Sequence, residues 1–280
     1  MDSFSRGGLT FDVRDSGPPD GPVVVCLHGF PQDGSAFDAV APLLAAQGLR
    51  VLAPDQRGYS PGARPTGRAP YVLRELVDDV VALLDAAGVE RAHVVGHDWG
   101  GAVAWALASR RADRVASLTA LSTPHPAAVV RSLTRSLQPL RSWYMAAFQL
   151  PGFPERLLLA DDGARLRRTL VSTGLAEDRA AAYTRRMQEP GALTAALAWY
   201  RAIPLGRGFG AGTVRVPTAY LSGRHDPFFA PAAVRGTARY VRGRFRSVAL
   251  DAGHWVPEAE PDRVADVVTS LARAAERDPH

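Results

Sequence analysis

The stretch Val94–Gly101 constrains the fold of this chain more than any other part. An apolar run at 92–95 predicts a buried strand, and a run of mostly small residues at 102–109 predicts a helix that follows at once. Glycines stand two residues before and two residues after Asp98. A turn that joins a strand directly to a helix leaves no space for side chains at those positions. The pattern therefore predicts a nucleophile elbow, which lifts one side chain above the edge of a sheet.

The side chain at the centre of this turn is a carboxylate, which limits the chemistry. Asp98 is ionised at neutral pH, so it can attack an sp3 carbon directly and form an alkyl ester. A histidine then remains free to activate the water that hydrolyses the ester. The alternative is that Asp98 only caps the helix that follows it. Capping does not require glycine on both sides, so we favour the nucleophile.

The composition indicates a globular protein with one large core. With 280 residues, of which 46% are hydrophobic and 22% charged, the chain can bury such a core, with or without a moderate insertion. Cys26 is the only cysteine, so no internal disulfide forms, and its apolar neighbours predict a buried thiol. No stretch is long and apolar enough for a membrane span, and residues 1–14 lack the apolar region of a signal peptide. We expect a soluble cytoplasmic protein, a monomer or a homodimer.

The charged residues exclude several classes of function. All 33 basic residues are arginine, which excludes a Schiff-base lysine and a phosphate-binding P-loop lysine. The net charge of +5 is compatible with a nucleic-acid partner, but the arginines are scattered, and the densest group, at 235–246, is interleaved with apolar residues. No group of histidine, cysteine and acidic residues has metal-ligand spacing, and no GxGxxG motif is present. We predict no nucleic-acid partner, no metal and no cofactor.

Strands alternate with helices on both sides of a central segment, which predicts an α/β fold. Such alternation implies right-handed crossovers and a mainly parallel sheet flanked by helices. The reactive groups of such sheets lie at the carboxyl ends of the strands. The expected strands are 4–6, 9–13, 23–27, 49–53, 92–95, 115–121, 218–221 and 246–250. The expected helices around them are 35–47, 72–87, 102–109, 231–240 and 262–273.

The alternation stops in the central segment, where only helices are expected. An all-helical insertion in an α/β core predicts a cap over the edge that carries the reactive groups. We therefore divide the chain into a core, residues 1–121 and 215–280, and a helical cap, residues 122–214. The cap helices are expected at 127–150, 154–159, 161–173, 177–188 and 191–202.

Three residues that each follow a predicted strand form a candidate catalytic constellation. Asp98, Asp226 and His254 occur in the order nucleophile, acid, base, which is the chain order of the α/β-hydrolase triad. Asp226 would hold the imidazole tautomer, and His254 would take a proton from water. Two other carboxylates compete with Asp226 for the role of the acid. Asp251 lies on the same loop as His254, and Asp55 also follows a strand.

Four short motifs carry a resemblance to a known family. They are His-Gly-Phe-Pro at 28–31, Asp-Gln-Arg-Gly-Tyr-Ser at 55–60, Gly-His-Asp-Trp-Gly-Gly at 96–101 and Gly-His-Trp at 253–255. Over nearly its whole length the chain resembles an α/β hydrolase of the epoxide hydrolase and haloalkane dehalogenase group. The resemblance implies an oxyanion hole formed by the backbone N–H groups of Phe30 and Trp99. It also implies that Pro31 helps to fix the oxyanion loop, through a cis peptide bond.

Two further motifs, in the cap, distinguish the members of this group. Residues 143–152, with Tyr144 four residues before Phe-Gln, and residues 198–202, with Tyr200, are similar to the tyrosine motifs of epoxide hydrolases. The resemblance implies that the two phenols donate the proton that an epoxide oxygen needs as its ring opens. Ala198 departs from the asparagine that the family often has there, a change that concerns packing more than chemistry. The alternative is that either tyrosine belongs to the core of the cap.

The leading hypothesis is a cofactor-independent epoxide hydrolase that converts an epoxide and water to a vicinal diol through an Asp98 ester. The residues expected to line the pocket favour a small apolar epoxide, and they are Phe30, Trp99, Met145, Phe148, Leu150 and Phe228. A haloalkane dehalogenase with the same triad is the second hypothesis, because Trp99 could donate to a halide. Similar dehalogenases more often have asparagine where Phe30 stands. A binding protein without activity is the third hypothesis, and the complete triad argues against it.

Overall fold

One eight-stranded sheet runs through the part of the chain that the computed structural model describes, residues 1–206 and 211–277. The strand order is β1-β2-β4-β3-β5-β6-β7-β8. The first two neighbouring pairs are antiparallel and the other five are parallel, which confirms the mainly parallel α/β fold. The strands are β1 (Ser3–Arg6), β2 (Leu9–Ser16), β3 (Val23–Leu27), β4 (Arg50–Pro54), β5 (Ala92–His97), β6 (Val115–Leu121), β7 (Thr218–Gly223) and β8 (Phe245–Leu250).

The central strands are apolar along their length because both faces of the sheet are covered. All five residues of β3 are buried. Val23, Val25 and Leu27 belong to one hydrophobic core, and Val24 and Cys26 belong to the other. This division follows from the alternation of side chains along a strand. The sheet is therefore packed on both faces, and the carboxyl ends of its strands can hold side chains in fixed positions.

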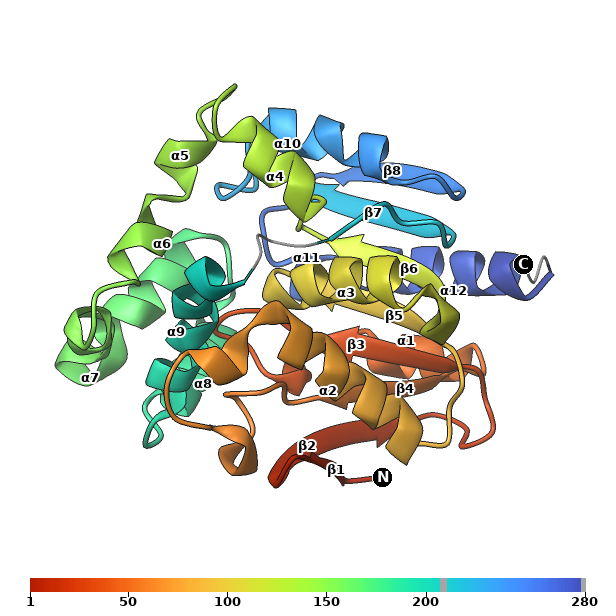
Figure 1. The fold of residues 1–280 in the computed structure, drawn as a ribbon, viewed down its shortest axis with the longest axis horizontal. Coiled ribbons are helices and arrows are strands. Elements are labelled where there is room, and N and C mark those ends of the chain that lie inside the picture. Colours follow the sequence, from red (N-terminus) through yellow and green to blue (C-terminus); the bar gives the residue numbers. More distant parts are fainter. Residues whose placement is uncertain (207–210, 278–280) are drawn as a thin grey trace.

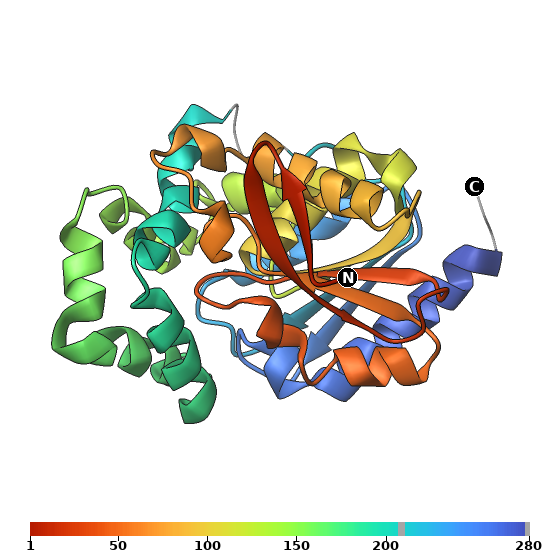
Figure 2. The same cartoon turned by 90° about the horizontal axis from the view of Figure 1, so that it is seen from below.

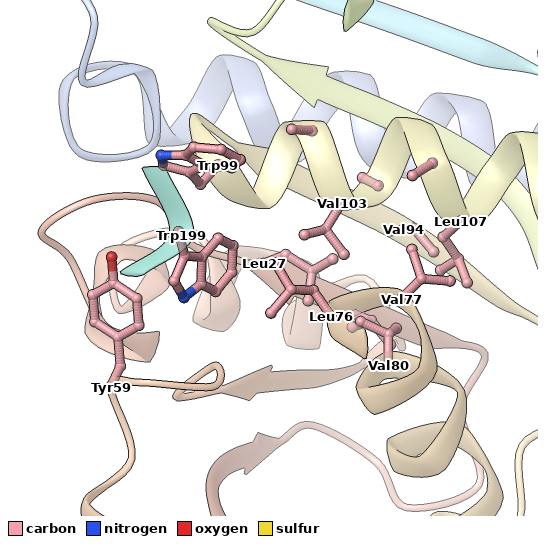
Figure 3. Packing of buried hydrophobic residues seen from close by; sticks show 14 of the residues in the cluster. Leu27, Tyr59, Leu76, Val77, Val80, Val94, Trp99, Val103, Leu107 and Trp199 are labelled. Atoms are coloured by element: carbon pink, nitrogen blue, oxygen red, sulfur yellow. The ribbon is translucent and has the colours of Figure 1, made fainter. Parts of the chain in front are cut away.

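Helices cover the two faces of the sheet (Figure 1, Figure 2). α2 (Leu73–Ala86) and α3 (Trp99–Arg110) lie on one face, and α1 (Ala41–Ala46) and α12 (Pro261–Arg277) lie on the other. Two shorter helices are α10 (Pro231–Gly236) and α11 (Val256–Ala259). Figure 3 shows the core between α2, α3 and the strands, which includes Leu27, Leu76, Val77, Val80, Val94, Val103 and Leu107.

Six helices of the described chain lie between β6 and β7, and most of them extend to one side of the sheet (Figure 1). They are α4 (Pro126–Ser132), α5 (Gln138–Arg141), α6 (Trp143–Ala147), α7 (Phe153–Ser172), α8 (Glu177–Met187) and α9 (Ala192–Ala202). α7 has nonhelical backbone at residues 160–163, so the two helices expected at 154–159 and 161–173 are present as its two segments. Within the described ranges, no helix is long and apolar enough to cross a membrane.

Prolines account for the largest differences between expected and observed helices. The single helix expected at 127–150 is wrong, because α4, α5 and α6 occupy this stretch and Pro139 lies in the first turn of α5. The helix expected at 35–47 is a 3₁₀ turn at Gly34–Phe37 followed by α1, with Pro42 in its first turn. Proline fits the first turn of a helix, but its ring and its missing N–H disrupt a helix interior.

Candidate active site

The turn between β5 and α3 has the geometry expected of a nucleophile elbow. Asp98 has φ 50° and ψ −120°, a conformation that residues other than glycine rarely adopt. A Cβ atom on Gly96 would lie 2.3 Å from the carbonyl oxygen of Gly100, and one on Gly100 would lie 2.1 Å from that of Leu27. Any side chain at either position would displace the backbone. The two glycines are therefore a steric requirement of this turn.

The carboxylate of Asp98 points away from the helix that it precedes. It makes no capping hydrogen bond to α3, which contradicts the alternative of a simple helix cap. Instead Oδ1 accepts a hydrogen bond of 2.8 Å from the backbone N–H of Phe30. The peptide bond between Phe30 and Pro31 is cis, as expected. This loop thus brings a backbone donor directly to one oxygen of the carboxylate.

His254 lies on the other side of the same carboxylate. Its Nε2 is 3.6 Å from Oδ2 of Asp98, and its Nδ1 is 2.8 Å from Oδ2 of Asp226. Burial by itself raises the pKa of Asp98, but the hydrogen bond and charge of His254 hold that pKa below its usual range. Burial by itself lowers the pKa of His254, but the two carboxylates, Asp226 first, raise that pKa to about 10. The three groups form one charged unit.

The two carboxylates that compete with Asp226 in the sequence have other partners. Asp251 lies 2.8 Å from Nε2 of His225 at the surface, where 88% of the Asp251 side chain is exposed. Asp55 binds Arg186 at 2.6 Å and accepts a hydrogen bond from a backbone N–H at 2.8 Å. Of the three carboxylates, Asp226 is the one in contact with His254.

The loop that carries His254 is held from behind by buried polar groups. The backbone carbonyl of His254 accepts a hydrogen bond of 2.6 Å from Ser122 and lies 2.9 Å from Nε2 of His97. The other ring nitrogen of His97 lies 2.8 Å from the side chain of Gln32. Burial lowers the pKa of His97 to about 3, so its ring is neutral at physiological pH. His97 and His254 therefore differ in charge, because the ring of His254 contacts two carboxylates directly and the ring of His97 contacts neutral groups.

The two tyrosines of the cap motifs meet beside Asp98. Tyr144 is on α6 and Tyr200 is on α9, and their ring centroids are 6.2 Å apart. Both rings also pack against Phe148, with centroids 5.5 and 5.0 Å away. Burial and the charge of Asp98 raise the pKa of both phenols. Both phenols therefore keep their protons at neutral pH.

A cavity of about 550 Å³ connects these groups, and Asp98, Tyr144, Tyr200 and His254 all line it. Phe30, Phe148 and Phe228 also line it, as expected. Trp99 and Met145 line a second cavity of about 70 Å³ that also reaches Asp98. The expectation that Leu150 lines the pocket is wrong. Leu150 lines neither cavity and lies after the end of α6 at Ala147, where half of it is exposed.

The profile of the alpha/beta hydrolase fold family matches residues 22–261.

This chain belongs to the alpha/beta hydrolase fold family.

Individual relatives narrow the likeness. This α/β hydrolase is 37% identical over 276 residues to the "AB hydrolase superfamily protein YfhM" of Bacillus subtilis, with 94% of each chain covered. It is 32% identical over 299 residues to "Epoxide hydrolase A" of Mycobacterium tuberculosis, with 92% of each covered. Its fold matches a Bacillus megaterium epoxide hydrolase crystallised with its diol product, with a TM-score of 0.86, 25% identity, and 97% and 99% of the two chains covered. The hydrolase is therefore similar to epoxide hydrolases over nearly its whole length.

Two residues of this α/β hydrolase that sequence reasoning missed connect the cap region to the loop of the acid. Gln138 is fully buried, donates to the carbonyl of Phe228 at 2.8 Å and accepts from the N–H of Ala230 at 2.8 Å. Arg141 donates to the carbonyls of Asp226 and Pro227, at 3.1 and 2.8 Å. Neither residue belongs to a recognisable motif, so no local signal marks them. In the described residues, no group of three or more histidine, cysteine or acidic side chains could hold a metal ion.

Proposed function

We propose that this α/β hydrolase is an epoxide hydrolase, which converts an apolar epoxide and water to a vicinal diol through an ester on Asp98. The observation that carries the proposal is the pair of protonated phenols, Tyr144 and Tyr200, in the same cavity as a buried ionised carboxylate. A carboxylate nucleophile and an acid for the leaving oxygen are the two groups that ring opening needs. The named epoxide hydrolases among its relatives support this assignment.

In the first step, an oxygen of Asp98 attacks one carbon of the epoxide ring. The bond between that carbon and the ring oxygen breaks, and the oxygen takes a proton from Tyr144 or Tyr200. The products are an alkyl ester on Asp98, a hydroxyl group on the neighbouring carbon and one tyrosinate. The insertion of residues 122–214 acts as the cap that keeps bulk water from this step.

In the second step, His254 becomes a base because the first step removes a charge. The Asp98 carboxylate is one of the groups that raise the pKa of His254. Once the carboxylate is an ester, this pKa falls, and His254 gives its proton to the tyrosinate that the first step left. The neutral ring can then take a proton from water. Asp226 stabilises the resulting imidazolium, at an Nδ1 to Oδ2 distance of 2.8 Å.

The water oxygen attacks the carbonyl carbon of the ester. The N–H of Phe30, 2.8 Å from Oδ1 in the free enzyme, stabilises the negative charge that develops on that oxygen. We propose the N–H of Trp99 as the second donor. Collapse of the intermediate releases the diol and regenerates the Asp98 carboxylate. The proton that His254 took from water stays on its ring, so the free enzyme returns to its starting state, with a charged His254 and two neutral phenols.

The intact mass of a His254→Gln variant tests this proposal. The variant is incubated with terminal epoxides and, separately, with chloroalkanes and bromoalkanes. We expect a mass gain equal to the whole epoxide, located on the peptide that contains Asp98, because the ester forms without the base and persists. His225→Gln is the matched control, since it makes the same change in an exposed histidine, and it should accumulate no adduct. A gain equal to an alkyl group without its halogen would assign a dehalogenase, and no gain with any epoxide contradicts the proposal.

A further inference from the structure

Asp98 lies on the boundary between two cavities of very different size. The larger cavity is about 550 Å³ and the smaller is about 70 Å³. Four residues line both of them, namely Asp98, Tyr144, Tyr200 and Phe228. The nucleophile and both candidate acids therefore stand where the two cavities meet.

The larger cavity offers an apolar volume for a bulky group. Trp143 of α6 and Leu158, Leu166 and Leu170 of α7 form part of its wall. Such a wall favours a hydrophobic substituent, because the removal of apolar surface from water lowers the free energy of the complex. On the side where α7 lines the larger cavity, side chains of the cap region set the size of that cavity.

The smaller cavity is enclosed by aliphatic and aromatic side chains from the cap region and the core. Met145 of α6 and Val129 of α4 face it from the cap region, and Ala102, Pro124 and Pro126 line it from below. A volume of about 70 Å³ holds roughly two to four non-hydrogen atoms. Of its lining residues, Met145 and Val129 are the two aliphatic side chains whose shortening would enlarge it.

We infer that this enzyme selects epoxides with two unequal sides: a bulky apolar group on one ring carbon, and hydrogen or a group of up to roughly two carbons on the other. The inference rests on the proposed function. The ring oxygen must face the two phenols while one ring carbon faces Asp98, so the substituents of the two carbons diverge. One substituent then enters each cavity, and Met145 and Val129 set the limit on the smaller one.

The test measures kcat/KM for a series of trans epoxides that keep one large apolar substituent. The second substituent grows from hydrogen through methyl, ethyl and propyl to butyl. In the unmodified enzyme we expect kcat/KM for the butyl compound to be at least tenfold lower than for the terminal epoxide. The reason is that one methylene that does not fit costs about tenfold or more. The ratio of the two kcat/KM values, butyl over terminal, then measures the limit. Met145→Ala and Val129→Ala should each raise this ratio at least tenfold. Leu158→Ala, which shortens the wall of the larger cavity, should leave the ratio unchanged.

Each result has a distinct meaning. Equal kcat/KM along the series in the unmodified enzyme overturns the inference and leaves the epoxide hydrolase proposal intact. A fall that Leu158→Ala relieves as well as Met145→Ala also overturns it, because the smaller cavity would then not set the limit. The absence of turnover for every epoxide overturns the proposed function itself. The two cavity variants lie on separate helices, and the substrate series in the unmodified enzyme needs neither of them to fold.

Discussion

The candidate site has two walls that are held in different ways. On the sheet wall, Asp98, Asp226 and His254 follow the ends of β5, β7 and β8. Glycines beside them let backbone segments pack so closely that no side chain would fit at the glycine positions. A Cβ atom on Gly223, for example, would lie 1.9 Å from the carbonyl oxygen of Gly253. On the cap wall, α6 and α9 carry the tyrosines, and side-chain hydrogen bonds of Gln138 on α5 join the cap region to the loop after β7.

Because of this difference, we expect the sheet wall to determine the chemistry and the cap wall to determine which substrates fit. The groups on the sheet wall gain their positions from strand ends and from close backbone contacts, so their geometry tolerates almost no change. The cap wall is built from side chains of α4, α6 and α7, whose sizes can change without moving the sheet. We therefore expect substitutions on the sheet wall to abolish steps of the reaction, and substitutions on the cap wall to change its rate or its substrate range.

The sharpest test of the sheet wall compares two aspartates near His254. We expect Asp226→Asn to lower the rate of ester hydrolysis by about 10⁴-fold, because asparagine neither stabilises the imidazolium nor holds the correct tautomer. Asp251→Asn, the control, changes an exposed residue that contacts His225 and should stay within about twofold of the unmodified rate. Steady-state turnover and the mass of the trapped ester measure both effects. Equal losses in the two variants would contradict the assignment of the acid.

The two phenols are the part of the cap wall that takes part in the chemistry. We expect Tyr144→Phe with Tyr200→Phe to slow ester formation by about 10²- to 10⁴-fold, because the opening ring then lacks its proton donor. Rapid-quench measurement of ester formation separates this effect from hydrolysis. Tyr240→Phe is the control, since Tyr240 stacks on His125 away from both cavities. An unchanged rate of ester formation in the double variant would rule out the phenols as acids.

A buried carboxyl group links the two walls and should give the smallest effect. Oε1 of Glu258, four residues after His254, accepts hydrogen bonds from Gln32 at 2.7 Å and from Tyr183 of α8 at 3.0 Å. Burial raises the pKa of Glu258 to about 7, from 4.5 in an exposed glutamate. Between about pH 4.5 and pH 7 the folded protein keeps a proton on Glu258 that the unfolded chain has released. The free energy of unfolding therefore falls as the pH rises through this range.

Glu258→Gln should remove that dependence. Between pH 5 and pH 8 the unmodified protein should lose up to about 3 kcal/mol more of its unfolding free energy than the variant does. Urea denaturation at the two pH values measures the difference. Glu276→Gln, at an exposed position, is the control and should behave as the unmodified protein. If Glu258→Gln lost as much unfolding free energy between pH 5 and pH 8 as the unmodified protein, the pH dependence would not come from Glu258.

Much of the sheet wall could be predicted because its signals are local. β3 and β6 have the expected bounds, since continuous apolar runs of that length are typical of doubly covered strands. The spacing of Gly96 and Gly100 around Asp98 predicted the turn that the structure has, because the backbone geometry of a turn depends on the residues within it. The tyrosines were predicted from the motifs at 143–152 and 198–202, which are also short stretches of sequence.

What only the tertiary structure decided involves residues that are distant in the sequence. Three carboxylates could have paired with His254, and the packing of the loops after β7 and β8 brought Asp226 to it, 28 residues away. The breaks between α4, α5 and α6 placed Met145 on a cavity and Leu150 outside both cavities. Local sequence determines local backbone, whereas the position of one side chain against another depends on the packing of every element between them. The sequence of this hydrolase thus determined the chemical groups and the strand ends that carry them, and the tertiary structure decided which groups meet and how much space lies on each side of the nucleophile.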